Sequence, residues 1–433
     1  MIASQKLGPA ISQIHVTPIA VTDPPLLNAA GIHAPFALRT IVELVTEDGI
    51  SGISEIPGSA LIDQALKMAG DLIVGKDPFQ VNLIRDELKQ HFGSDQHRGD
   101  APWDQRKLVH VFSAIEVACL DIAGKVVNRP VCDLLGGKRR EQVPYAAYLF
   151  YKKEGAGGEH GFGKDDSVRG WAAARQEGAL DPAGIVKQAR SMCESFGFRS
   201  IKLKGGAFPP PAELEAVKAL FDNFTEMPIR FDPNAAWSLD TATGIGKEME
   251  KYLEYLEDPV RGQENMALLR RQLKVPLATN MCTTSFGDLP SSIALGSEDI
   301  ILSDHHFWGG LQASMQLSVF CEVFGRKLSM HSNSHLGISL AAMTHLGAAL
   351  PEVPFALDTH YPWQSEEIIQ GGRFQFEEGS LKVPSGSGLG VELDRQSLER
   401  LHQNYLQCGI KERDDEAEMQ KLDPRWKFEK TRW

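Results

Sequence analysis

Several features that would assign a chain to a particular class of protein are missing from this sequence of 433 residues. No block of Lys and Arg interrupts the acidic composition, and the formal net charge of -12 argues against nucleic acid or an anionic membrane as partner. The six cysteines are scattered without any C-x-x-C spacing, so we predict neither a disulfide framework nor a zinc site. No apolar run of about 18 residues and no signal-peptide pattern is present. We therefore expect a cytoplasmic protein whose partner is a small molecule or a metal.

The N-terminal part of the chain, 1–140, contains two kinds of hydrophobic pattern. Period-two alternation in ISQIHVTPIAV (11–21) and TIVELVTEDGISGISEI (40–56), broken by Asp48-Gly49, predicts antiparallel strands joined by a hairpin. From Asp63 the period becomes helical, as in AIEVACLDIAGKVV (114–127). This order of strands followed by helices predicts an α+β domain.

In the rest of the chain, short apolar runs that end in a polar residue alternate with helical stretches. Eight such runs are present: VPYAAYLFY, SIKLKGG, IRFDPNAAW, YLEDPV, LATNMC, IILSDHHFW, KLSMHSNSH and FALDTH. Polar residues at 204, 232, 257, 280, 304, 331 and 358 recur at a regular interval. This interval is close to the length of one strand-helix-strand unit, which is roughly 30 residues. We therefore predict a (β/α)8 barrel, in which active-site residues sit at the carboxyl ends of the strands.

One of these runs, SIKLKGG, carries two lysines. Lys202 and Lys204 are two positions apart, so both side chains point to the same face of the predicted strand. Lysines are almost never buried without a partner, so we expect both ammonium groups to meet an oppositely charged group in the same interior space.

Oxygen-bearing side chains end the next three runs. Asp232, Glu257 and Asn280 offer two carboxylates and an amide oxygen, a ligand set that suits Mg²⁺. An Asp before Pro, as in Asp232-Pro233, is also a common turn former, so each residue alone has a structural interpretation. Polar residues at six consecutive predicted strand ends favour the functional interpretation.

The strand-end residues resemble those of the enolase superfamily, and the strings around them resemble its glucarate dehydratase family. These strings are KLKGG, DPNAAWSLD, LEDP, ATNM, DHHFW, HSNSHLGISLA, THLGAA and DTHYPWQ, with NAAGIHAPFALRTIVEL, EIPG and GIKERDD outside the barrel. The resemblance implies a modified TIM-type barrel at 141–395, an α+β capping domain at 1–140, and a C-terminal segment at 396–433 that packs back on the capping domain. It also implies a homo-oligomer.

The resemblance further implies removal of a proton next to a carboxylate, with Mg²⁺ as cofactor. Lys204 is expected to be one base and His331 the other, with Asp304 fixing the imidazole tautomer. Lys202 is expected to donate a hydrogen bond to the developing enediolate. The neighbouring ammonium group and the metal are expected to lower the pKa of Lys204.

An acid sugar is the implied substrate. By position, the resemblance assigns contacts with its hydroxyls and carboxylates to Asn28, His33, Tyr148, Lys202, Asn234, Ser332, Asn333, His360 and Arg413. Arg413 would pair with the distal carboxylate. The alternative for Arg413 is a solvated surface arginine beside acidic neighbours.

The chain departs from the family pattern at a few positions. HSNSHLG stands where the family has HSNNHFD, which places Ser334 and Gly337 at altered positions, and Pro102 replaces a usual threonine. The Gly-rich loop at 152–166 also differs. We expect a Mg²⁺-dependent dehydratase of D-glucarate and L-idarate, with another hexarate such as galactarate, or a weakly active paralogue, as the alternative. A racemase and a binding protein without activity are the remaining hypotheses.

Overall fold

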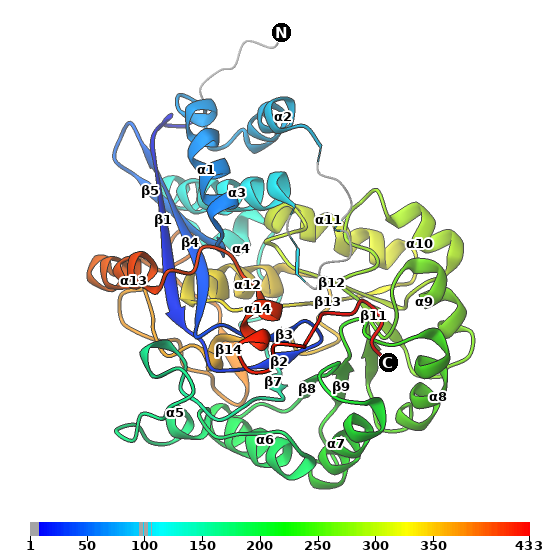
Figure 1. Ribbon diagram of the computed structural model, residues 1–433. Coiled ribbons are helices and arrows are strands. Elements are labelled where there is room, and N and C mark those ends of the chain that lie inside the picture. The colour runs from blue at the N-terminus through cyan, green and yellow to red at the C-terminus, as the bar shows by residue number, and fades with distance from the viewer. Residues whose placement is uncertain (1–7, 95–97, 99–102, 105) are drawn as a thin grey trace.

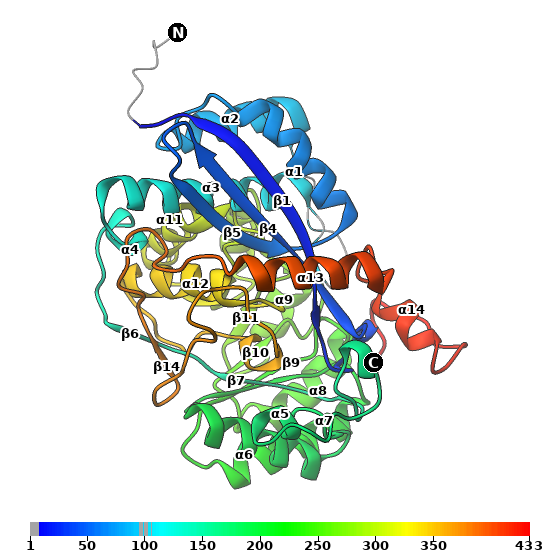
Figure 2. The ribbon, with the colours of Figure 1, turned by 90° about the vertical axis from the view of Figure 1, so that its left-hand side faces the viewer.

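The computed structural model describes residues 8–94, 98, 103–104 and 106–433, which form a strand-rich N-terminal layer above a barrel (Figures 1 and 2). The N-terminal sheet is antiparallel in the order β1-β4-β5, with β1 (Ile11–Thr22), β4 (Phe36–Thr46) and β5 (Ser51–Pro57). In the turn between β4 and β5, Gly49 has φ +79°, a conformation that glycine adopts without steric cost. The hairpin predicted at Asp48-Gly49 is confirmed.

Helices α1 (Ala60–Ile73) and α3 (Lys107–Val127) pack on this sheet, and α2 (Val81–Phe92) packs against both of them. Ser59 caps the N-terminus of α1, because its side chain accepts a hydrogen bond from the backbone N–H of Ile62. The buried faces of α1, α2 and α3 share one apolar cluster with Val42, Leu44 and Ile56 of the sheet. Helical periodicity from Asp63 onward therefore reflects a face that packs on strands.

The barrel is a parallel sheet whose seven strands lie in sequence order. They are β7 (Ala147–Phe150), β8 (Ile201–Lys204), β9 (Ile229–Asp232), β10 (Tyr255–Glu257), β11 (Leu277–Thr279), β12 (Ile300–Ser303) and β13 (Lys327–Met330). The helices between and after them are α6 (Pro182–Phe196), α7 (Pro210–Asn223), α8 (Leu239–Met249), α9 (Gln263–Arg270), α10 (Leu289–Leu295), α11 (Gly310–Val323) and α12 (Gly337–Ala349). The alternation of strand and helix agrees with the predicted barrel.

The last predicted strand, FALDTH, is reduced to a bridge. The Leu357 N–H donates to the Pro144 carbonyl at 2.8 Å, and the Asp358 N–H donates to the Met330 carbonyl at 3.1 Å, so this segment still joins β13 to the start of the barrel. Pro144 has no N–H to extend a ladder. It lies in β6 (Gln142–Pro144), which pairs antiparallel with β14 (Ser380–Lys382) instead of continuing into β7.

The remaining elements are short, apart from α13, which crosses the N-terminal sheet beside β1 (Figure 2). They are β2 (Leu27–Asn28), β3 (Gly31–Ile32), α4 (Val131–Leu134), η1 (Gly158–His160), α5 (Trp171–Ala174), η2 (Tyr361–Trp363), α13 (Arg395–Cys408) and α14 (Asp415–Gln420). Helix α13 packs on β1, where His402 Nδ1 lies 2.7 Å from the Pro18 carbonyl. The end of the chain lies on the barrel, because the Trp433 carbonyl accepts from the Ser238 N–H at 2.6 Å. The predicted domain limits stay a prediction.

Among the described helices, none is both long enough and apolar enough to cross a membrane.

Helix α12 is buried along its whole length, because it lies between the barrel and β5 of the N-terminal layer.

Candidate active site

A cavity of about 360 Å³ lies between the N-terminal layer and the carboxyl ends of the barrel strands. Most of the predicted site residues line it, although they come from segments far apart in the sequence. These residues are Asn28, His33, Tyr148, Lys204, Asn234, Asn280, His331, Ser332, Asn333, His360 and Arg413. The fold thus brings both predicted bases and most of the predicted substrate contacts to one cavity.

The other four predicted site residues lie beneath the cavity wall. Lys202, Asp232, Glu257 and Asp304 each expose no more than 2% of the side chain. The ammonium group of Lys202 is enclosed by carboxylates, and its contact with the substrate stays a prediction.

Lys202 is the centre of a buried ionic cluster. Its Nζ lies 2.6 Å from Glu257 Oε2, 2.6 Å from Asp358 Oδ2 and 3.7 Å from Asp232 Oδ2. Burial opposes the charge, but Asp358 and Glu257 outweigh it and raise the pKa of Lys202 well above its usual value. Burial and the neighbouring carboxylates raise the pKa of Glu257 well above its usual value, despite Lys202.

Lys204 points into the cavity from the same strand. Its Nζ lies 2.6 Å from Asp232 Oδ2 and 2.6 Å from Asn234 Oδ1. Burial opposes ionisation of Asp232, but Lys204 and Lys202 lower its pKa below the usual value. Both ammonium groups therefore lie beside carboxylates that come from the barrel. These carboxylates are the oppositely charged groups that we expected the two lysines to meet.

The segments after β9 and β10 have an unusual backbone. Asn234, Ala235 and Asp258 all have positive φ, at 56°, 58° and 38°. Such conformations cost of order 1 to 3 kcal/mol each in non-glycine residues and are concentrated at functional sites. Asp258 also precedes a proline, and its Oδ2 accepts from the Asn280 N–H at 2.8 Å. It therefore positions the end of the next strand.

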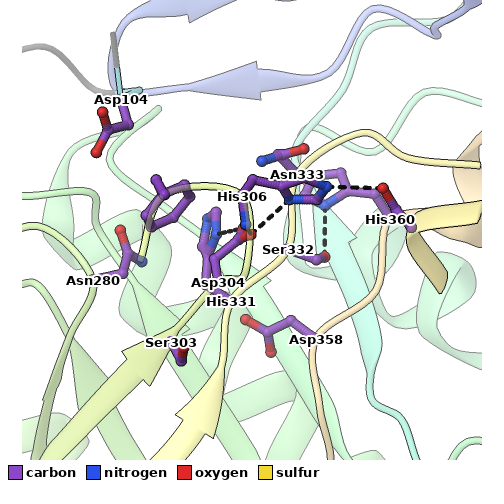
Figure 3. Close-up of polar contacts among 12 residues, drawn as sticks. Asp104, Asn280, Ser303, Asp304, His306, His331, Ser332, Asn333, Asp358 and His360 are labelled. Carbon is purple, nitrogen blue, oxygen red and sulfur yellow. Dashed lines mark hydrogen bonds and ion pairs between the residues drawn. The ribbon is translucent and has the colours of Figure 1, made fainter. Parts of the chain in front are cut away.

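On the other side of the cavity, Asp304 joins two imidazoles (Figure 3). Its Oδ2 lies 3.1 Å from His331 Nδ1, and its Oδ1 lies 2.6 Å from His306 Nδ1. Burial opposes ionisation of Asp304, but the imidazoles lower its pKa well below the usual value. Burial lowers the pKa of His331, and the hydrogen bond to Asp304 offsets this only in part. His331 is thus held neutral, as a general base requires.

The donor set of the predicted metal ligands fits Mg²⁺. Asp232, Glu257 and Asn280 are buried at successive strand ends. Burial and the neighbouring carboxylates raise the pKa of Glu257, and a divalent cation held here would favour its charged form. The Asn280 amide donates to Glu257 Oε1 at 2.6 Å, and its Oδ1 accepts from Arg98 at 3.0 Å. A carbonyl oxygen has two lone pairs, so this contact leaves one for a metal.

The predicted distal substrate contacts form a second hydrogen-bonded group. Arg413 donates to both oxygens of Asp415, at 2.8 and 2.6 Å, and lies 3.0 Å from His33 Nε2. Asn28 also donates to Asp415, at 2.7 Å. Arg413 therefore has a buried partner and a place in the cavity wall, which distinguishes it from a solvated surface arginine.

The altered positions differ in what they touch. Ser334 lines the cavity, whereas Gly337 begins α12, and a Cβ there would lie 2.6 Å from Ile369 Cδ1 and 2.9 Å from Glu367 Oε2. Glu367 Oε1 accepts from the Gly337 N–H at 3.1 Å, so its carboxylate occupies the space that a side chain at 337 would need. Pro102 lies outside the described residues.

Several residues of the site were not predicted. Arg39 of β4, His306 and Arg98 contact predicted site residues, and Glu213 accepts three backbone N–H groups of the loop after β8, from Gly206 to Phe208. His306 follows Asp304 by two positions in DHHFW, which was the available signal. Arg39 and Arg98 had none, because their partners are distant in sequence.

Comparison with known proteins identifies the family. Residues 15–136 match the mandelate racemase / muconate lactonizing enzyme N-terminal domain, and residues 184–397 match the enolase C-terminal domain-like family. A protein of Streptomyces coelicolor named "probable glucarate dehydratase" is 45% identical over 96% of this chain and 97% of its own.

Solved structures agree. An enolase of Thermobispora bispora complexed with magnesium and formate is 46% identical, with a TM-score of 0.92 over 98% of this chain and 100% of that chain. An enolase of Pseudomonas fluorescens with bound magnesium, potassium and tartrate is 43% identical, with a TM-score of 0.91 over 98% and 99% of the two chains. The chain therefore belongs to the enolase superfamily and, within it, to the glucarate dehydratase family.

Proposed function

We propose that this protein is a Mg²⁺-dependent acid-sugar dehydratase that converts D-glucarate and L-idarate to 5-dehydro-4-deoxy-D-glucarate. The observation that carries the proposal is that Lys204, the last residue of β8, and His331, the residue after β13, both line the wall of one cavity. Two bases around one substrate carbon would accept either epimer. The named relative supports the same reaction class.

A proton next to a carboxylate is weakly acidic, because its removal places a second negative charge beside the first. Mg²⁺ held by Asp232, Glu257 and Asn280 would stabilise that developing charge as a Lewis acid. Lys202 would act from beneath the cavity by keeping the carboxylate cluster partly neutralised.

The chain's own residues would move the protons. His331, neutral and with Nδ1 turned to Asp304, would use Nε2 either to take the proton from the carbon or to protonate the β-hydroxyl as it leaves. Lys204 would take the proton from the opposite epimer as a free amine, after its Nζ has left Asp232 and Asn234 and has lost one proton to solvent. Loss of that hydroxyl as water and tautomerisation of the enol then give the keto diacid.

The distal carboxylate and hydroxyls would meet the group around Arg413 and His33. Arg413 already directs two donors to Asp415, so its place is fixed before substrate binds. Ser332 contributes similarly, because its hydroxyl lies 3.1 Å from His360 Nδ1 and orders that ring at the cavity wall.

The test is to incubate the purified protein with a panel of acid sugars, with and without Mg²⁺. The measured product is a 2-keto acid. We expect glucarate and idarate to give the same product, and EDTA to abolish its formation. Absence of turnover with both, in a protein that binds Mg²⁺, would overturn the proposal.

A second candidate is a dehydratase of another hexarate such as galactarate. Ser334 favours it, because this altered position faces the cavity. The same panel separates the two candidates by the ratio of kcat/KM values. A racemase would exchange the α-proton for solvent deuterium without losing water, and a binding protein would do neither.

A further inference from the structure

Arg39 connects the N-terminal layer to two residues near His331 in space, which are Asn333 and His306. It lies in β4 with 1% of its surface exposed, and its Nε donates to Glu55 Oε1 at 2.8 Å. One terminal nitrogen donates to Asn333 Oδ1 at 2.9 Å, and the other lies 3.3 Å from His306 Nε2. A single guanidinium therefore touches a predicted substrate contact and the imidazole next to Asp304.

These contacts determine where His306 carries its proton. His306 Nε2 lies 3.3 Å from a guanidinium nitrogen of Arg39, which only donates, and 2.8 Å from the Ser339 hydroxyl, which is able to donate to it. On the other side of the ring, the carboxylate of Asp304 only accepts, so Nδ1 has to be the donor. His306 then carries its proton on Nδ1, which lies 2.6 Å from Asp304 Oδ1.

The effect continues to His331. Asp304 Oδ1 accepts from both His306 Nδ1 and the His306 backbone N–H, at 2.6 and 2.9 Å. Its Oδ2 is left for His331 Nδ1 at 3.1 Å. His331 therefore donates from Nδ1 and keeps the lone pair of Nε2 for proton transfer.

We infer that Arg39 and His306 are positioning residues: together they set the tautomer of His331 through Asp304, and Arg39 at the same time places the Asn333 amide. The inference rests on the proposed role of His331 as a base. It assigns a function in the reaction to the N-terminal layer beyond covering the cavity.

A metal site is the competing interpretation of the same residues. Asp304, His305 and His306 offer ligand atoms that lie within 4.8 Å of one another. Both nitrogens of His306 and both oxygens of Asp304 already have hydrogen-bond partners, however, and the Arg39 guanidinium beside His306 would repel a cation. The geometry favours a hydrogen-bonded relay.

The relay predicts how His331 should titrate. The charged or titratable groups that act on it are Asp304, Lys202, Lys204, His335 and His360. Removing the donor at 306 leaves Asp304 with one hydrogen bond fewer, so it would hold the protonated form of His331 more strongly. A charge-assisted hydrogen bond is strong enough to shift that titration upward by about one pH unit.

The first test needs no substrate. Imidazole ¹⁵N NMR of the ligand-free protein would report the tautomers and the titration of His331 in the wild type, in His306→Leu and in His306→Asn. The asparagine keeps a donor near the position of Nδ1. We expect an upward shift in the leucine variant and a return toward the wild-type value in the asparagine variant. Equal titration in all three, or no rescue by asparagine, would overturn the inference.

The second test uses turnover. In His306→Leu, kcat should fall about tenfold and the acidic limb of its pH profile should move upward with the NMR titration. Arg39→Met combined with Glu55→Gln, which avoids leaving a buried carboxylate unpaired, should also raise KM because Asn333 loses its donor. His345→Asn is the matched control, since His345 is buried in α12 and hydrogen-bonds to Leu389, away from the dyad.

The two tests separate this inference from the proposed function. If the wild type turned over no acid sugar, the proposed function would fail while the NMR result still decided the relay. If turnover were found with an unshifted pH profile in His306→Leu, the relay alone would fail.

Discussion

The two sides of the cavity are built by different physical means. On the side of β8 to β10, buried ammonium and carboxylate groups meet at 2.6 Å, and all of them come from the barrel. On the side of β12 and β13, a single carboxylate joins two imidazoles by hydrogen bonds. Ion pairs between fully charged groups hold the first side together. On the second side, the hydrogen bonds depend on which imidazole nitrogen carries the proton.

The sides also differ in their dependence on the N-terminal layer. Glu55 of β5 accepts the backbone N–H groups of Leu336 and Ser339 at the start of α12, and Glu116 of α3 accepts those of Leu311 and Gln312 at the start of α11. These two helices follow the strands that carry His331 and Asp304. The charged groups of the ionic cluster all come from the barrel, whereas the imidazole side also uses Glu55, Glu116 and Arg39 of the N-terminal layer.

The largest expected effect is the loss of the imidazole base. His331→Asn should reduce turnover of the preferred acid sugar by roughly 10² to 10⁴-fold, because general acid-base catalysis contributes about that much. Mg²⁺ affinity, measured by calorimetry, should stay within about twofold, since His331 is not in the proposed ligand set. Turnover near the wild-type level would remove the histidine side from the mechanism.

The ionic side is expected to respond through stability. Lys202→Met leaves Glu257, Asp358 and Asp232 without their shared cation, and breaking such a buried pair costs about 3 to 5 kcal/mol. Urea unfolding measures this loss. Lys327→Met is the matched control, because its pair with Glu352 is exposed and should contribute no more than about 1 kcal/mol. Equal midpoints for both variants would contradict the described cluster.

The free energy of unfolding should depend on pH through Glu116, which links α3 of the N-terminal layer to the start of α11. Burial raises the pKa of Glu116 from 4.5 to about 7, although the two backbone N–H groups oppose this. The folded protein therefore holds this proton more tightly than the unfolded chain, so stability present below about pH 4.5 is lost as the pH rises to about 7. The loss is on the order of 3 kcal/mol.

Glu116→Gln should remove that part of the slope, whatever its constant effect on stability. Urea unfolding of both proteins between pH 5 and 8 gives the difference, and ionisable groups elsewhere cancel in it. Parallel curves for the two proteins would mean that Glu116 keeps an ordinary pKa.

The smallest expected effect concerns specificity. Ser334→Asn restores the family residue at an altered position that lines the cavity, so it should change the ratio of kcat/KM for glucarate over galactarate by about tenfold or less. Substitution at Gly337 is not a useful counterpart, because Glu367 and Ile369 occupy the space. An unchanged ratio would move the determinant of specificity away from residue 334.

Much of the fold was accessible from local pattern. The regular spacing between strand-end polar groups predicted the barrel, since each strand and helix recurs at that interval. The eighth strand is shorter than predicted. Pairing of Leu357 with the Pro144 segment stops after one bridge, because Pro144 lacks a donor and β6 turns to β14.

The candidate site was predicted in part for the same reason. Lys204, Asn280 and His331 end strands, so the barrel directs them to one cavity. Arg39 and Glu55 lie in a pair of strands with alternating apolar and polar residues. That pattern predicts only that one face of the strands is buried. Their partners Asn333 and Leu336 lie 294 and 281 positions further along the chain, and no local pattern connects them.

By itself, the sequence determined the barrel, the family and the chemical types at each strand end, because period, spacing and motif are local properties. Only the tertiary structure decided which charges pair. It placed Lys202 beneath the cavity among three carboxylates and left Lys204 at the cavity wall, although both lysines point to the same face of one strand. The physical reason is that burial and the distances between charged groups depend on segments that meet only after folding.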